Sequence, residues 1–309
     1  LLYSVPVPAQ TGVSNTSVTM NAASMENSGF EFSATYRNRD HALKYDISAN
    51  VSTLKNKVTS LGIGKDSYIS GAYATYVGQE IGQFYGWVYK GIARTQEDLD
   101  NNAVQQGANV GDCLYEDISG PDGTPDGVID AYDQTVLGSG LPKVNFGLST
   151  HLEYKGFDLN ISTYGVLNYH VSDDIYNSLN SCYGYGNKEV GMLDANRWSE
   201  DGTYLSSVPR TYAANNATLA WNDLFSSRKI QNAAYWKIAN VELGYNFPDK
   251  WFGGYVSGVR LYVSAQNLYT FTGYHGYNVD YAGGTFTPGY NFCSFPSART
   301  FMCGLHFTF

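Results

Sequence analysis

The chain is poor in charge and in long apolar runs, and both absences limit what it can be. Only 15% of its 309 residues are charged, against about 25% in ordinary soluble domains. Acidic residues outnumber basic ones 28 to 19 and no basic cluster is present, so we expect no nucleic-acid partner. The longest apolar run has about four residues, at 233–236, whereas a transmembrane helix needs about 20.

Cysteine is scarce, and recognisable catalytic motifs are missing. None of the four cysteines forms a C-x-x-C pair, and the wide spacing leaves the disulfide state of Cys113, Cys182 and Cys293 open. There is no G-x-S-x-G, no phosphate-binding loop and no metal-ligand spacing among the histidines. We therefore expect no enzyme, and keep a glycan-cleaving activity only as a weak alternative. The N-terminus has neither a Met nor signal-peptide features, so we expect the chain to begin inside a longer precursor.

Aromatic residues are abundant, with 5 Trp, 27 Tyr and 15 Phe, and long segments alternate between apolar and polar residues. In 143–154, for example, Phe146, Leu148 and Leu152 share one face while His151 and Glu153 share the other. Such a period of two is typical of strands that separate two environments. The alternating segments are 29–37, 41–53, 143–154, 156–168, 239–247, 258–271 and 299–309.

The lengths and connections of these segments favour a transmembrane barrel. A tilted strand needs about 9–11 residues to cross a bilayer, and a sheet in lipid must close because its edges cannot be hydrated. Short turns alternate with long loops at about 5–23, 54–142, 170–233 and 272–297, as in outer-membrane barrels with long extracellular loops. We predict an all-β fold, an antiparallel transmembrane β-barrel portion. The alternative is a soluble extracellular β-sandwich that serves as a binding module.

Aromatic residues of the apolar face gather near the short-turn ends, which predicts one interfacial girdle. Its expected members are Tyr36, Tyr154, Phe157, Tyr245, Phe247, Phe307 and Phe309. Further aromatics fill the long loops, where they suit sugar or peptide binding, protein contacts or packing of the loops on one another. They are Tyr73, Tyr76, Phe84, Tyr85, Trp87, Tyr89, Tyr176, Tyr183, Tyr185, Trp198, Trp221, Tyr274, Tyr277, Tyr281, Tyr290 and Phe292.

Several blocks of the sequence resemble the SusC/RagA family of TonB-dependent outer-membrane transporters. The blocks include Glu26–Glu31, Gly156–Leu159, Asn240–Pro248 (NVELGYNFP) and Arg260–Thr272 (RLYVSAQNLYTFT), and they occur in the family's order. The resemblance covers essentially all of 1–309 and implies the C-terminal portion, seven strands, of a plugged barrel of about 22 strands. The N-terminal plug, the remaining strands and the segment that contacts TonB are not part of this chain.

The resemblance also implies a function and partners. The expected function is import of oligomeric nutrients through the outer membrane, together with a SusD-like surface lipoprotein that caps the barrel. Oligosaccharides are the expected substrates, and the RagA branch implies oligopeptides as the alternative. A dimer of the transporter–lipoprotein complex is expected. The C-terminal residues Phe301, Phe307 and Phe309 resemble the signal that the barrel-assembly machinery recognises.

An acidic segment has the spacing of an EF-hand-type calcium loop, with a glycine, Gly127, at the sixth position. The expected ligands of Ca²⁺, or of Mg²⁺, are Asp122, Thr124, Asp126, the Val128 carbonyl, Asp130 and Asp133. The segment departs from the pattern by Thr at the third position, Pro125 between ligands and Asp at the twelfth. The alternative is a solvated acidic turn. We predict a structural ion that stiffens an external loop.

Overall fold

The computed structural model describes residues 2–6, 17–21, 23–62, 65–182, 187–193, 197–211, 221–252, 256, 258–280, 283–292 and 294–308. Seven long strands form one antiparallel sheet in the order β22-β18-β17-β14-β13-β5-β4. Their bounds are β4 Glu31–Asn38, β5 Leu43–Thr53, β13 Val144–Tyr154, β14 Phe157–Leu167, β17 Tyr235–Phe247, β18 Gly258–Thr272 and β22 Thr300–Thr308. These are the seven segments predicted from alternation, and sequential strands are neighbours throughout.

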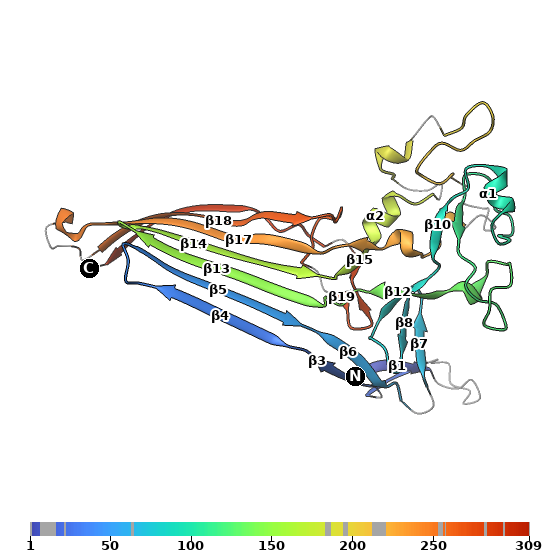
Figure 1. Ribbon diagram of the computed structural model, residues 1–309, viewed down its shortest axis with the longest axis horizontal. Coiled ribbons are helices and arrows are strands. Elements are labelled where there is room, and N and C mark those ends of the chain that lie inside the picture. The colour runs from blue at the N-terminus through green and yellow to red at the C-terminus, as the bar shows by residue number, and fades with distance from the viewer. Residues whose placement is uncertain are drawn as a thin grey trace.

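The sheet has a short-turn end and a loop end (Figure 1). Residues 39–42, 155–156 and 248–257 connect the strands at the first end, where the last strand also finishes. Apart from the 3-10 helix Asp249–Phe252 in the last of these connections, the remaining elements gather at the other end, beyond the long strands. The tight turn at Lys155 and Gly156 has positive φ at both residues, 48° and 87°, as a two-residue hairpin with the favoured twist requires.

Strand β17 begins earlier than the alternation predicts. The prediction started it at 239, but it starts at Tyr235. A bulge interrupts its register with β18 between Ile238 and Asn240, so the alternation pattern did not reveal the first residues of the strand. On β18, Asn267 takes a φ of 52° opposite this irregularity. A bulge shifts the alternation by one residue, so Lys237 falls on the same face as Asn240 and the period-two pattern is lost locally.

The apolar face of the sheet is bare. Leu148, Leu243, Val263 and Phe307 all lie on it with 40–50% of their surface exposed. No second sheet packs on this face among the described residues, and the cores of the structure lie elsewhere, around the loops. A β-sandwich would bury this face in its interior. The arrangement therefore argues against the soluble sandwich alternative.

The long loops carry small sheets of their own. Strands β3 Ser24–Ser28 and β6 Lys55–Ser60 pair beyond β4 and β5, and a four-stranded sheet follows in the order β12-β9-β8-β7. The strands of this sheet are β7 Ser67–Ser70, β8 Tyr73–Tyr76, β9 Gln83–Gly86 and β12 Thr135–Ser139. Strands β10 Tyr89–Ile92 and β11 Cys113–Tyr115 form a separate pair. Further short strands are β1 Leu2–Pro6, β2 Ser17–Asn21, β15 His170–Asp173, β16 Gln231–Asn232, β19 Gly283–Gly284, β20 Thr287–Pro288 and β21 Tyr290–Asn291.

Helices are few and short. They are α1 Gln96–Asp100, α2 Asp174–Leu179 and the 3-10 helices Ala131–Asp133, Val190–Leu193, Ser227–Lys229 and Asp249–Phe252. Thr95 caps α1 in a capping box with Asp98. In this box the Asp98 carboxylate accepts a hydrogen bond from the Thr95 backbone N–H, which lowers the pKa of Asp98. Within the described part of the chain no helix has the length and apolarity to span a membrane.

The first and second long loops pack into one unit. Arg210 binds the buried Asp112 carboxylate through Nε and Nη2, at 2.6 and 2.7 Å, although 98 residues separate them. Asn222 donates to the same carboxylate at 2.7 Å and accepts the Cys113 backbone N–H at 2.7 Å. These contacts satisfy buried polar groups that would otherwise be costly. The loops at this end are therefore a folded body and not loose chain.

Candidate functional site

The polar face carries an ion-pair network near the short-turn end. Arg260 on β18 reaches across β17 to Asp158 on β14, with Nε 3.0 Å from Oδ2, and its Nη2 lies 2.6 Å from the Glu242 carboxylate. Asn246 donates to Asp158 at 3.0 Å. Gly244 lies beneath this bridge, where a Cβ would stand 2.5 Å from both the guanidinium and the Asp158 carboxylate. Charged side chains thus connect three neighbouring strands. The middle strand needs a glycine beneath them, because a side chain there would collide with the ion pair.

A second polar network continues along the same face on β14, β13 and β5. His151 is 2.6 Å from the Asn160 side chain through Nδ1 and 2.9 Å from Glu153 through Nε2. Lys44 lies 3.6 Å from the other Glu153 oxygen. The half-exposed polar groups are bonded to each other along the sheet, as expected for a wall that faces water.

At the loop end of the same face, the third long loop is fastened to the sheet. Lys237 is 4% exposed, and its ammonium forms an ion pair with Asp280 at 2.5 Å. The Tyr164 hydroxyl lies 3.3 Å from both Asp280 oxygens. A buried group of Asp173, Tyr274 and Asn291 anchors the loop a second time, with Asn291 Nδ2 2.7 Å from the Tyr274 hydroxyl. Burial raises the pKa of Tyr274, so this phenol stays neutral.

A pocket of about 380 Å³ lies beside the fastened loop tip. Tyr164 and Asn145 of the polar face line it, and Val279 and Asp280 of the loop close one side. The floor belongs to a packed core, because Tyr235, Val166 and Tyr169 are all at most 8% exposed. The Tyr164 and Tyr235 rings meet edge to face with centroids 6.1 Å apart. The pocket therefore combines aromatic surface with amide, hydroxyl and carboxylate groups.

The apolar face is bounded by aromatic side chains at both ends. Near the short turns the Phe157 and Tyr245 rings meet in a tilted arrangement with centroids 4.6 Å apart, which agrees with the predicted girdle. At the loop end Trp236 stacks on Phe271 at 5.3 Å, and Tyr269 lies 4.7 Å from that ring. This second belt was missed, because the bulge in β17 hid the outward position of Trp236. Two belts on one apolar face are typical of outer-membrane barrels.

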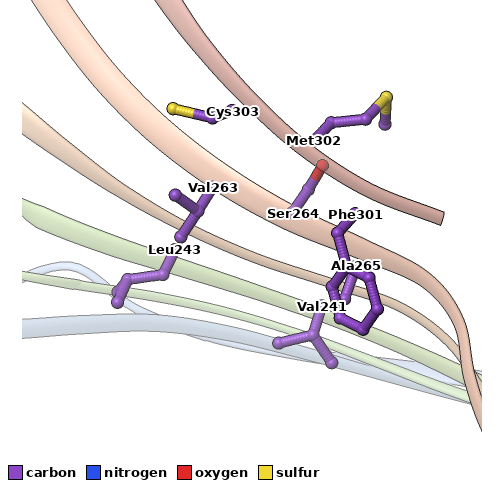
Figure 2. Close-up of a pocket in the computed structure, with 8 residues that line it drawn as sticks. All are labelled: Val241, Leu243, Val263, Ser264, Ala265, Phe301, Met302 and Cys303. Atoms are coloured by element: carbon purple, nitrogen blue, oxygen red, sulfur yellow. The ribbon is translucent and has the colours of Figure 1, made fainter.

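Between the belts the apolar face has a shallow groove of about 440 Å³ (Figure 2). Val241 and Leu243 of β17, Val263 of β18 and Phe301 and Cys303 of β22 contribute to it. Phe301 and Phe307 are 69% and 49% exposed on this face, and Phe309 lies outside the described residues. The lining of the groove is mostly apolar.

The acidic segment adopts a capped turn. Asp133 is fully buried and accepts the backbone N–H groups of Ile118, Ser119 and Asp130, at 2.8, 3.2 and 2.8 Å. The Asp126 carboxylate accepts the Val128 N–H at 3.0 Å, as in an Asx turn. No three His, Cys, Asp or Glu side chains converge to hold a metal ion in the part of the chain that the structure describes. The calcium assignment of Asp122, Thr124, Asp126, Val128, Asp130 and Asp133 stays a prediction.

The loop cysteines are buried thiols. Cys113 and Cys182 are free and at most 1% exposed, and burial raises the pKa of each to about 12. Cys303 is also free, on the apolar face, and Cys293 lies outside the described residues. The loop thiols are therefore protonated and unreactive at neutral pH.

Many predicted loop aromatics serve packing. The buried rings of Tyr73 and Phe84 pack on each other and on Phe225, and Tyr73 also meets Tyr290, with centroids 5.4–6.5 Å apart. Others are exposed and free to meet a partner: Trp198, Tyr277 and Phe292 keep more than half of their surface in solvent. Tyr183, Tyr185 and Tyr281 lie outside the described residues. Tyr164 and Tyr235, which line the pocket, come from strands and carry no local signal of a site.

The sheet and its two faces define a portion of a β-barrel wall of the outer-membrane type, and comparisons with known proteins agree with this fold. No family model matches the chain. TonB-dependent receptor P3 of Formosa agariphila is 31% identical over 328 residues, and SusC of Bacteroides thetaiotaomicron is 26% identical over 329. Each match covers 100% of this chain and 31% or 29% of the relative. The chain thus spans about a third of the length of these relatives.

A solved structure of the RagAB peptide transporter matches all of this chain and 32% of its own, with a TM-score of 0.77 and 22% identity. The "open-open" state of the RagAB peptide importer gives a TM-score of 0.75. Over its whole length the chain is similar to TonB-dependent receptors, SusC among them, and to the RagAB peptide transporter. These similarities agree with the predicted SusC/RagA resemblance, and the predicted all-β barrel fold is confirmed.

Proposed function

We propose that this chain forms part of the wall and of the external loops of a TonB-dependent transporter, which imports oligomeric nutrients through the outer membrane. The observation that carries the proposal is the two-faced sheet, with a bare apolar face between two aromatic belts and a hydrogen-bonded polar face opposite. From Trp236 to Tyr245 the strand rises roughly 30 Å at about 3.3 Å per residue. A tilt of about 40° reduces this to about 23 Å, close to the ~25 Å apolar band of outer-membrane barrels.

Oligosaccharides are our first candidate substrates. The loop end of the polar face offers tyrosine rings beside amide and hydroxyl groups, a combination that suits sugars. Oligopeptides are the second candidate, favoured by the likeness to the RagAB peptide transporter. In both cases the protein transports and does not catalyse.

The partners in this proposal are a SusD-like surface lipoprotein above the loops and TonB, through the N-terminal plug of the whole protein. Exposed loop aromatics support the lipoprotein contact, because such side chains are enriched at protein interfaces. Phe295 is 89% exposed and Tyr277 is 65% exposed. We propose that two such complexes pair into a dimer, and that Phe301, Phe307 and Phe309 form the barrel-assembly signal.

The loop end also carries the proposed calcium site. Asp122 and Asp126 are exposed carboxylates in a short turn, and their repulsion falls when a cation lies between them. A bound ion would stiffen the turn, and no transport step depends on it. Removing the ion should therefore change loop mobility and leave the sheet unchanged.

Affinity purification of the tagged full-length protein from native outer membranes tests the proposal. We expect extraction only with detergent, co-purification of a lipoprotein, and a bound oligomer that mass spectrometry identifies as saccharide or peptide. Cells that lack the protein should lose uptake of that oligomer, and an uncoupler of the proton gradient should have the same effect. Release of the protein into detergent-free buffer would contradict the membrane role.

A further inference from the structure

We propose that the pocket formed by Tyr164, Asn145, Tyr235 and the loop tip at Val279 and Asp280 binds one sugar unit of a neutral oligosaccharide. This inference rests on the proposed import function and gives it a site. The pocket lies on the polar face of the sheet, below the third long loop, where an incoming chain would pass. Its volume of about 380 Å³ is within the usual range of small-molecule sites.

The first argument is the pre-formed aromatic surface. Tyr164 is 37% exposed, so part of its ring is open to a ligand. Tyr235 is 8% exposed and meets it edge to face, while Tyr169 and Val279 complete the buried floor. A tyrosine ring held by a packed core loses little conformational entropy on binding. The C–H face of a pyranose can stack on such a ring while the sugar hydroxyls stay in the polar part of the site.

The second argument is the set of polar groups at the rim. The Asn145 amide is exposed and has both a donor and an acceptor. Asp280 lines the pocket, with one carboxylate oxygen bound to Lys237 and both at 3.3 Å from the Tyr164 hydroxyl, so a hydroxyl group and a carboxylate stand together at the rim. Sugar hydroxyls both donate and accept, so they match this mixed set.

The third argument is charge. Lys237 is 4% exposed and its ammonium neutralises Asp280, so the pocket has no net charge. A peptide terminus would place its charge beside one member of this pair and would have to break a partly buried ion pair, which is costly. A neutral sugar meets no such penalty. The charge balance therefore favours saccharide over the charged ends of a peptide.

The test uses the full-length transporter in detergent and isothermal titration with neutral linear oligosaccharides, namely cello-, xylo- and malto-hexaose, and with hexa-alanine. We expect one of the saccharides to bind and Tyr164→Ala to weaken its Kd at least tenfold. Tyr164→Phe keeps the ring and should raise the Kd by only about two- to threefold. For comparison, a tenfold rise in Kd corresponds to ~1.4 kcal/mol.

Tyr269→Ala is the matched control, because Tyr269 is also an exposed strand tyrosine but lies on the opposite face, near the same height. It should bind as the unchanged protein does. Heat-modifiable migration of each variant on a gel checks that the barrel is folded.

Equal saccharide affinity in Tyr164→Ala and in the unchanged protein would overturn the site. Binding of hexa-alanine that Tyr164→Ala abolishes would overturn the substrate class. Either result leaves the import function standing if deletion of the whole protein still stops oligomer uptake. If deletion has no effect on uptake, the import function itself fails.

Discussion

Arginine in place of Ile161 tests the outer face of the sheet most sharply. Ile161 lies on the central strand β14 and pairs with Val241, which stands between the belts at Trp236 and Tyr245. At about 3.3 Å per residue and a tilt of about 40°, Val241 is about 13 Å in depth from the belt at Trp236 and about 10 Å from the belt at Tyr245. Ile161 therefore lies near the middle of the apolar band.

At that depth an outward-facing arginine in a transmembrane barrel costs about 2–4 kcal/mol. We expect Ile161→Arg to lower the free energy of unfolding of the full-length protein from phospholipid vesicles by this amount, measured by guanidinium titration and tryptophan fluorescence. Ser162→Arg is the matched control, since Ser162 is the next residue, exposed on the polar face. A surface substitution changes stability by about 0.5 kcal/mol or less. Equal effects of the two arginines would refute the membrane-facing assignment.

Three further predictions concern the polar face and the loops. Asp158→Asn leaves Arg260 with a single carboxylate partner and should lower the free energy of unfolding by about 1–3 kcal/mol, with much less effect once Arg260 is also replaced by Met. The folded state retains the protons of Cys113 and Cys182, whose pKa is raised to about 12, while the unfolded state loses them above about pH 8.5. Stability should therefore fall as the pH rises from about 9 to 12, and rapid maleimide labelling of these thiols at pH 8.5 would contradict their burial. Asp126→Asn should reduce bound calcium in elemental analysis and speed hydrogen exchange in 122–133; identical metal content would refute the site.

Alternation was enough to predict the seven long strands, because a sheet between lipid and water must place every second side chain on each face. The same rule failed at 235–238, where one bulge residue reverses the phase. The prediction of a single aromatic girdle was incomplete for that reason. Alternation in 258–271 already placed Tyr269 and Phe271 on the apolar face, but the outward position of Trp236 becomes visible only when the pairing across the bulge is known.

The interior of the loops could not be predicted from local sequence. Asp112 and Arg210, 98 residues apart, meet because two loops fold onto each other, and Lys237 of β17 meets Asp280 because the third long loop, which follows β18, folds back over the sheet. No spacing rule links such residues. The acidic segment is the opposite case. Its spacing is local and predicts metal ligands, whereas in the described structure the carboxylates of Asp130 and Asp133 accept backbone N–H groups as caps of a short helix.

The central claim is that the two faces of this sheet meet different solvents. A nitroxide spin label at Leu148 and another at its neighbour Ser149, in the full-length protein in lipid vesicles, test it directly by power-saturation electron spin resonance. We predict that Leu148 is accessible to oxygen dissolved in lipid and shielded from a water-soluble nickel quencher, with the reverse at Ser149. Nickel access at Leu148 would contradict the account.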